Sequence, residues 1–136
     1  MKKCIFCQIA KKELPSDIIF ENKNVMAILD IMPVNLGHVL VIPKKHFATM
    51  VDVPDKLLQE MIVVSKKVGK AIMKGLKVKG FNLSTSNGRV AGQKIDHVHF
   101  HLIPRFANDG LKLWPQRQGY RATEAEKIVK KIKSKL

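Results

Sequence analysis

The stretch His97-Val98-His99-Phe100-His101-Leu102-Ile103-Pro104-Arg105 alternates histidine with apolar residues over its first six positions. Period-two alternation is typical of a β-strand, because successive side chains of a strand point to opposite faces. The pattern predicts a strand that ends at the proline, with its three histidines on one face, roughly 7 Å apart, and its apolar side chains in a core. Imidazole titrates close to neutral pH, so such a row can supply nucleophiles, acid–base groups or metal ligands.

Composition limits the kinds of protein that this chain can be. Its 136 residues predict a single domain, 1–136, and 46% hydrophobic residues can form a core. No apolar run is long enough to span a bilayer, and the start lacks a secretory signal, so we expect a cytoplasmic protein without a membrane partner. The formal net charge of +14 favours anionic partners such as nucleotides, nucleic acid or acidic lipids.

Hydrophobic periodicity outside the histidine stretch predicts an α+β fold. Apolar residues recur at helical spacing from about Pro54 to Lys74, which predicts one long inserted helix, ended by Gly75 and Gly80. A short helix is expected at 8–13. The remaining apolar runs predict an antiparallel sheet built as a meander, with strands at 18–21, 25–30, 38–43, 81–86 and 97–103.

Residues 111–136 form a C-terminal extension with a basic helix. Thr123 is the expected N-cap of this helix, with Glu126 three residues later. The lysines of the helix are most simply a solvated face. A nucleic-acid role would normally bring aromatic residues or a recognised binding module, which the sequence lacks, so nucleic acid is an alternative partner and not the favoured one.

The histidine stretch resembles the signature of the histidine triad (HIT) family of nucleotide hydrolases and transferases. Flanking segments agree, so that the resemblance runs from about Cys4 to Arg105. It implies an HIT-like fold, a homodimer, and a purine nucleotide substrate that is attacked at its α-phosphate through a covalent nucleotidyl-histidine. The chain looks most like the zinc-containing, prokaryotic-type branch of the family.

The resemblance gives catalytic roles to three histidines. His99 holds the position of the nucleophile, where a mid-strand site would mount the ring rigidly. His101, on the same face, is expected to donate a hydrogen bond to the phosphate or to the leaving group. His38 opens a segment that matches one carrying a supporting histidine of the active site, although by itself it could be a surface histidine at a strand start.

Further residues match the nucleotide-binding positions of the family. Asp30, at a strand end, matches a carboxylate that binds the ribose hydroxyls, although such an aspartate can also cap a turn. Gln93 and Asn87 are expected to bind phosphate from a glycine-flanked turn, whereas Ser86 departs from the amide-bearing residue of relatives. The residues that match the base pocket, and that could equally be plain core, are Ile5, Phe6, Ile9, Ile28 and Ile31.

Cys4 and Cys7 form a Cys-x2-Cys pair in an N-terminal segment, residues 1–12, that is similar to a zinc knuckle. The pair alone is a weak signal for metal, because zinc takes four ligands, and two free thiols are the alternative. The resemblance completes the set with His46 and His97, which implies structural zinc in a closed Cys2His2 site. Magnesium is expected only together with a polyphosphate substrate.

The leaving group stays open at this point. Ile103-Pro104-Arg105 resembles dinucleoside polyphosphate hydrolases, whereas Trp114-Pro115 resembles the C-terminus of nucleoside phosphoramidases, and the family also contains nucleotidyl transferases. Two other classes compete with an enzyme: a nucleotide- or nucleic-acid-binding module with little turnover, and an interaction protein whose histidines bind metal. The intact middle histidine favours the enzyme.

Overall fold

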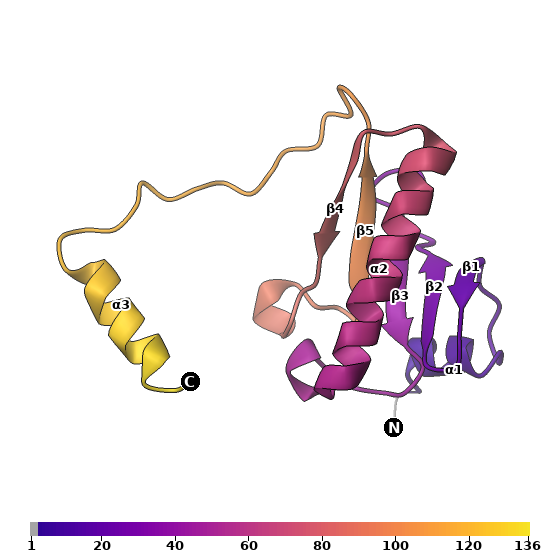
Figure 1. Ribbon diagram of the computed structural model, residues 1–136, viewed down its shortest axis with the longest axis horizontal. Coiled ribbons are helices and arrows are strands. Elements are labelled where there is room, and N and C mark those ends of the chain that lie inside the picture. Colours follow the sequence, from indigo (N-terminus) through magenta and orange to yellow (C-terminus); the bar gives the residue numbers. More distant parts are fainter. Residues whose placement is uncertain (1–2) are drawn as a thin grey trace.

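Five strands form one antiparallel sheet, with a long helix across one face and a short helix on the other (Figure 1). The computed structural model describes residues 3–136, so Met1 and Lys2, the start of the expected N-terminal segment, lie outside the described residues. The expected α+β class and antiparallel sheet are confirmed. The elements in chain order are α1 (Ile5–Ala10), β1 (Ile18–Glu21), β2 (Val25–Leu29), β3 (Val39–Pro43), η1 (Met50–Asp52), α2 (Asp55–Leu76), β4 (Gly80–Ser84), η2 (Arg89–Ala91), β5 (Phe100–Arg105) and α3 (Glu124–Lys133).

The strand order in the sheet is β1-β2-β3-β5-β4. The first three strands follow one another as a meander. The chain then crosses to the far edge through α2 and returns, so β5 enters between β3 and β4. Each neighbouring pair is antiparallel. The strand that carries the end of the histidine stretch therefore lies inside the sheet, where its backbone is bonded on both sides.

The central strands β2 and β3 are buried on both faces. Alternate residues of these strands form one core with α2, and the residues between them form a second core with Phe6 and Ile9 of α1. Burial of both faces explains why the two strands are continuous apolar runs without polar alternation. The second core also holds α1 against the histidine segment, since the ring of Phe6 contacts those of His97 and His99.

The long helix is confirmed as α2, whose buried stripe includes Met61, Val68 and Ile72. The expected end at Gly75 is wrong, because Gly75 lies within the helix. Lys77 ends it instead in the left-handed conformation, with φ of 55°, and its amide donates to the carbonyl of Met73. A residue other than glycine can take this conformation at a modest cost when the bond to the last helical turn is formed.

The histidine stretch enters the sheet later than expected. β5 begins at Phe100, so His97 and His99 precede the strand, and the expected mid-strand position of His99 is wrong. The chain is still held at this point, because the amide of Val98 donates to the carbonyl of Phe47 at 2.7 Å, beyond the end of β3. The histidine segment is thus fixed by an irregular backbone contact and not by the ladder of the sheet.

Two further element boundaries differ from expectation. Pro104 does not end the strand but lies inside β5, opposite Phe81. The N-terminal helix α1 begins at Ile5, immediately after Cys4, and not at residue 8. Both cysteines are therefore carried at the start of this helix, which fixes their spacing.

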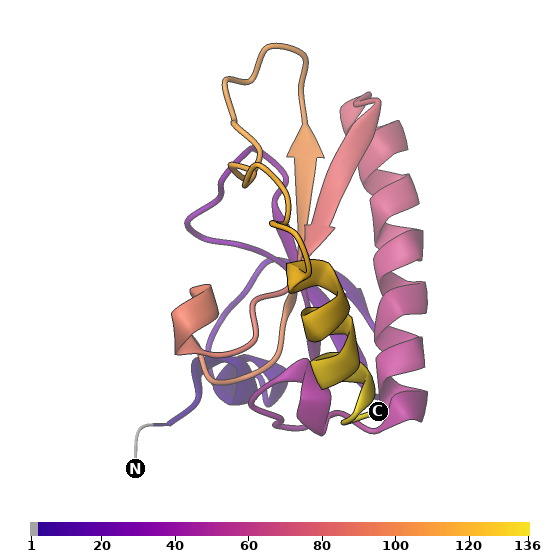
Figure 2. The ribbon, with the colours of Figure 1, turned by 90° about the vertical axis from the view of Figure 1, so that its left-hand side faces the viewer.

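After β5 the chain leaves the sheet. Residues 107–123 carry no helix or strand, and α3 has no buried residue. Figure 1 shows α3 well apart from the sheet, and Figure 2 shows it in front of the domain when viewed from that side. Thr123 precedes α3 as expected but makes no side-chain capping bond; the carboxylate of Glu124 accepts from the amide of Arg121 instead. Within residues 3–136, no helix is both long enough and apolar enough to cross a membrane.

Gly69 and Gly75 of α2 give a matched pair for testing the packing of the helix on β4. A Cβ at Gly69 would overlap the ring of Phe81, whereas one at Gly75 would meet no atom within 4 Å. We expect Gly69→Ala to lower the free energy of unfolding by about 1–2 kcal/mol, because the ring must shift. Gly75→Ala should raise it by about 0.5–1 kcal/mol, because alanine favours the helix. Urea unfolding measures both, and equal effects would contradict the close approach at Gly69.

Candidate functional site

A cavity of about 750 Å³ opens beside the histidine segment. His99 and His101 line it, together with His38 from the start of β3. The other walls come from α1, the end of β2 with the loop after it, and the loop that joins β4 to β5. All the residues expected to contact base and ribose line this cavity: Ile5, Phe6, Ile9, Ile28, Asp30 and Ile31. The lining therefore combines apolar side chains with the imidazoles and one carboxylate.

The protonation of His99 is set by a backbone carbonyl. Its Nδ1 lies 2.7 Å from the carbonyl oxygen of His97, which can only accept a hydrogen bond. Nδ1 must therefore carry the proton, and in the neutral ring Nε2 holds the lone pair. The sequence pattern singled out His99 as the candidate nucleophile, whereas the group that orients its ring is a carbonyl that no side-chain pattern reveals.

A chain of hydrogen bonds fixes the other two imidazoles. The amide of Val34 donates to Nδ1 of His38 at 3.1 Å, so the proton of His38 is on Nε2. That Nε2 lies 2.9 Å from Nδ1 of His101 and donates to it. The proton of His101 is then on Nε2, which is free to donate to a ligand. The ring of His101 lies 4.9 Å from that of His99, so the donor and the lone pair are neighbours.

Burial keeps both supporting imidazoles neutral. Burial is the largest cause that lowers the pKa of His101 to about 4, and the charges of His99 and His38 contribute in the same direction. Burial also lowers the pKa of His38, against the opposing effect of Asp30, whose carboxylate lies 3.7 Å from Nε2 of His38. Neutral rings are required for the chain of donors and acceptors, because a doubly protonated imidazole cannot accept.

The two amide side chains expected to bind phosphate do not line the cavity. Gln93 is buried, and its amide is used within the protein: Oε1 accepts from the amide of Gly88 at 2.8 Å, and Nε2 donates to the carbonyls of Ala48 and Ile95. The side-chain oxygen of Asn87 accepts from the amide of Met50 at 2.8 Å. Both side chains therefore form hydrogen bonds with backbone groups, and these bonds hold the loop before the triad in place.

Other residues of that loop reach the cavity instead. Ser86, Gly92 and Lys94 line it, as does Ser84 at the end of β4. Sequence analysis placed Ser86 as a departure and did not single out Ser84 or Lys94. A lone serine or one basic residue among 25 carries no periodic or spacing signal, so only the three-dimensional arrangement identifies them.

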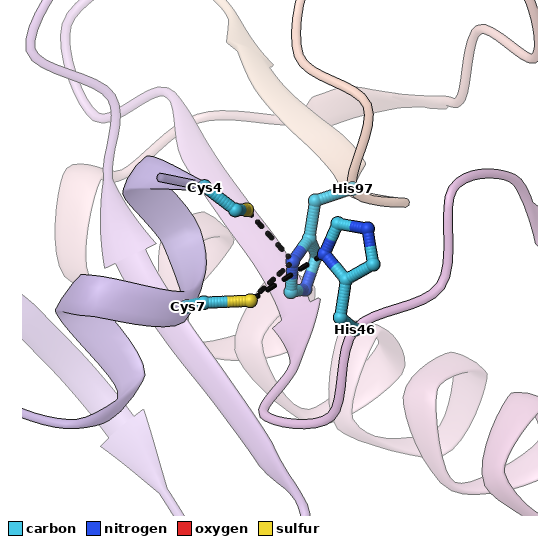
Figure 3. Close-up of side chains that lie close together, drawn as sticks. All are labelled: Cys4, Cys7, His46 and His97. Carbon is cyan, nitrogen blue, oxygen red and sulfur yellow. Dashed lines mark hydrogen bonds between the residues drawn. The ribbon is translucent and has the colours of Figure 1, made fainter. Parts of the chain in front are cut away.

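A second cluster brings together Cys4, Cys7, His46 and His97, whose ligand atoms all lie within 4.8 Å of one another (Figure 3). Nδ1 of His97 lies 3.3 Å from Sγ of Cys4 and 3.6 Å from Sγ of Cys7, and Nδ1 of His46 lies 3.4 Å from the latter sulfur. In a tetrahedral zinc site, bonds of about 2.3 Å to sulfur and 2.0 Å to nitrogen separate these atoms by about 3.5 Å. The donor set and spacing fit zinc.

His97 presents the correct nitrogen to this cluster. Its Nε2 donates to the carbonyl of Pro43 at 2.8 Å, which leaves the lone pair on Nδ1, the nitrogen of this ring that lies close to both sulfurs. Burial lowers its pKa to about 4, so the ring is in the neutral form that binds metal. Because the carbonyl of His97 also accepts from His99, one residue joins the cluster to the candidate nucleophile.

A third group, Asp30, His38 and His101, also has ligand atoms close together. Here, however, Nε2 of His38 and Nδ1 of His101 are bonded to each other and do not offer lone pairs to an ion. Magnesium prefers oxygen ligands, of which this group has one residue. The arrangement fits the hydrogen-bonded chain better than a metal site.

Residues 11–108 match the HIT domain. The chain belongs to the HIT domain family. It is 44% identical over 117 residues to adenosine 5'-monophosphoramidase of Saccharomyces cerevisiae, covering 85% of this chain and 72% of the relative. It is 38% identical over 108 residues to adenylylsulfatase of Arabidopsis thaliana, covering 79% of this chain and 55% of the relative.

Its structure superposes on that of a HIT family protein from Bacillus subtilis with a TM-score of 0.90 at 34% identity, covering 99% and 98% of the two chains. The HIT fold expected from the triad is confirmed.

The depressed pKa of His101 predicts how the stability of this HIT domain depends on pH. The unfolded chain takes up a proton at this residue with a pKa near 6.5, whereas the folded site does so at about 4. Stability is therefore lost as pH falls through this interval, by about 1–2 kcal/mol between pH 7 and pH 5 for His101 alone. Urea unfolding of His101→Gln should show a smaller loss over the same interval than the wild type. Equal losses would contradict the assignment.

Proposed function

We propose that this chain is a nucleotide hydrolase or transferase that acts at the α-phosphate of a purine nucleotide through a covalent nucleotidyl intermediate on His99. The observation that carries the proposal is the placement of a fixed lone pair on Nε2 of His99 beside a fixed N–H donor on His101. A nucleophile and an acid in adjoining positions suit displacement at phosphorus.

Each step uses a group described above. The lone pair of His99 attacks the α-phosphorus, and the bond from phosphorus to the leaving group breaks. Nε2–H of His101 donates a hydrogen bond to the leaving atom, and a leaving amine takes its proton from water. His38, held by the amide of Val34, keeps His101 in the required tautomer. Water or another acceptor then attacks the phosphorus, releases its proton to the solvent, breaks the bond between phosphorus and His99 and restores the free ring.

The cavity suggests how a nucleotide is held. The apolar lining formed by Phe6, Ile9 and Ile28 suits a base, and the carboxylate of Asp30 at the end of β2 can accept hydrogen bonds from ribose hydroxyls. The names of the two enzymes to which the chain is similar describe the hydrolysis of adenylates with different leaving groups, an amine and a sulfate. These names support an adenine nucleotide as the substrate of this chain, and they support a site of this kind that accepts more than one leaving group.

We also propose that Cys4, Cys7, His46 and His97 bind one structural zinc, as in the zinc-containing branch that the sequence resembles. All four ligands would come from the protein, so no position is left for water or substrate. The metal would supply a crosslink that ties α1 and the segment after β3 to His97, two residues before the nucleophile. His97 would then position His99 through its carbonyl.

The homodimer implied by the resemblance is a proposal supported by three surfaces. The first is strand β4, which lies at the edge of the sheet with Leu83 half-exposed. The second is α2, where the consecutive residues Ile62 and Val63 are exposed. The third surface is the extension after β5, whose helix α3 has no buried residue in this chain. The superposition on the Bacillus subtilis structure covers nearly the whole chain, so an extension in this position recurs in a relative.

Substitution of the nucleophile tests the proposed activity. We expect His99→Ala to lower turnover of adenosine phosphoramidate and diadenosine polyphosphates by orders of magnitude, because attack needs the imidazole, and to leave nucleotide binding largely intact. Mass spectrometry of rapidly quenched wild-type enzyme should detect one nucleotidyl group per active chain, absent in the variant. Near-normal hydrolysis by His99→Ala would sink the proposal. Nucleotide binding without turnover in the wild type would favour the alternative of a binding module.

Metal content tests the proposed zinc. Protein purified without chelators should contain about one zinc per chain. Cys7→Ser should contain far less and unfold at a lower temperature, because a lost ligand opens the crosslink. His101→Gln is the matched control, since it removes a histidine that lies outside the cluster and should retain zinc. A zinc-free wild type that is fully stable, with two reactive thiols, would refute the site.

A further inference from the structure

The candidate cavity contains one side chain with a permanent positive charge. Of the residues 3–136 that line it, Lys94 is the single lysine or arginine and Asp30 the single carboxylate. The rest of the lining is apolar, histidine, serine or glycine. A phosphate-bearing ligand would therefore meet one fixed cation in this cavity, and that cation is not part of the hydrogen-bonded histidine chain.

The backbone of Lys94 is held firmly from both sides. Gln93, the preceding residue, bonds through its amide to Gly88, and to the carbonyls of Ala48 and Ile95. The guanidinium of Arg89 donates to the carbonyl of Lys94 itself at 3.2 Å. The side chain of Lys94 is exposed and extends from a fixed backbone position on the lining of the cavity.

The ammonium of Lys94 is also uncommitted. Among residues 3–136 no carboxylate forms an ion pair with it, although other cations of the domain are paired. The nearest acidic residue in sequence, Asp96, is paired with Arg89 at 2.9 Å. An unpaired ammonium beside an anion site can give its whole interaction to the ligand.

We propose that Lys94 makes this enzyme selective for adenylates whose leaving group is an anion, namely a phosphate chain or a sulfate. The inference rests on the proposed function, and it concerns the leaving group that the triad leaves undetermined. Lys94 comes from the loop that leads into His99, whereas the base and ribose positions lie on α1 and at the end of β2. It therefore belongs to the loop that carries the proposed nucleophile and not to the elements that carry the base and ribose positions.

The chemistry separates two kinds of leaving group. When His99 attacks the phosphorus of a phosphoramidate, the departing amine takes a proton from water while Nε2–H of His101 donates a hydrogen bond to it. When it attacks an adenylate of phosphate or sulfate, the breaking P–O bond leaves its electron pair on an oxygen that needs no proton. That developing charge is stabilised by a nearby cation. Lys94 can serve the second reaction and contributes little to the first.

The experiment compares three substrates with three variants. The substrates are adenosine 5'-phosphoramidate, diadenosine tetraphosphate and adenosine 5'-phosphosulfate, which release ammonia, a nucleotide polyphosphate and sulfate. Lys94→Met removes the charge and keeps the length, and Lys94→Arg keeps the charge. Lys70→Met on the exposed face of α2 removes the same charge away from the cavity, and so controls for long-range attraction.

We expect Lys94→Met to lower kcat/KM by about tenfold or more for at least one of the two anionic leaving groups, and by less than about threefold for the phosphoramidate. The substrate whose kcat/KM falls shows whether Lys94 recognises a phosphate chain or a sulfate. Lys94→Arg should restore most of the loss, and Lys70→Met should behave as wild type. An equal fall on all three substrates would show that Lys94 binds the common adenylate and would overturn the proposal, as would no effect on any.

Binding in a His99→Ala background separates failure of this inference from failure of the proposed activity. There, Lys94→Met should weaken diadenosine tetraphosphate by about tenfold and leave adenosine 5'-monophosphate within about threefold, measured by calorimetry. If the wild type showed no turnover but Lys94→Met still produced this difference in affinity, the proposed activity would be refuted and the selectivity in binding would stand. If Lys94→Met changed the affinities for the two ligands by the same factor, the selectivity would be refuted.

Discussion

The hydrogen bond from Nδ1 of His99 to the carbonyl of His97 is the contact on which the rest of the site depends. It places the lone pair of His99 on the nitrogen that faces the cavity. The peptide that carries this carbonyl is itself fixed, because the side chain of His97 is bonded to Pro43 and surrounded by the cysteine-containing cluster. The second core, through Phe6, presses on both rings. Structural support and chemistry thus meet in the short irregular segment from His97 to His99.

Main-chain groups determine the tautomers of His99, His97 and His38, and the tautomer of His101 follows from that of His38. The carbonyls of His97 and Pro43 and the amide of Val34 each define one ring, and the bond between His38 and His101 passes the definition on. Peptide groups do not titrate, so this polarity holds over a wide range of pH as long as burial keeps the rings neutral. A site built with carboxylates in these positions would raise the pKa of the imidazoles and charge them.

The sheet, the long helix and the histidines could be predicted because each leaves a periodic trace in the sequence. The limits of prediction lie where distant segments bond irregularly. Asn87 and Gln93 were expected at the phosphate, but their partners, Met50 and Ala48, are about forty positions away and no local pattern couples them. The start of β5 was misplaced for a similar reason, since Val98 bonds to Phe47 outside the ladder. Lys94 became visible only as a lining residue of a cavity.

The insertion of β5 between β3 and β4 has a consequence for the biosynthesis of this protein. Until residue 105 has left the ribosome, β3 has no partner on one side, although it is apolar on both faces. Unpaired apolar edges recruit other chains, and pairings between distant segments form slowly. The nascent chain is therefore most prone to aggregate during the synthesis of α2, β4 and the loop that follows. The positive charge that α2 carries would keep growing chains apart during this interval.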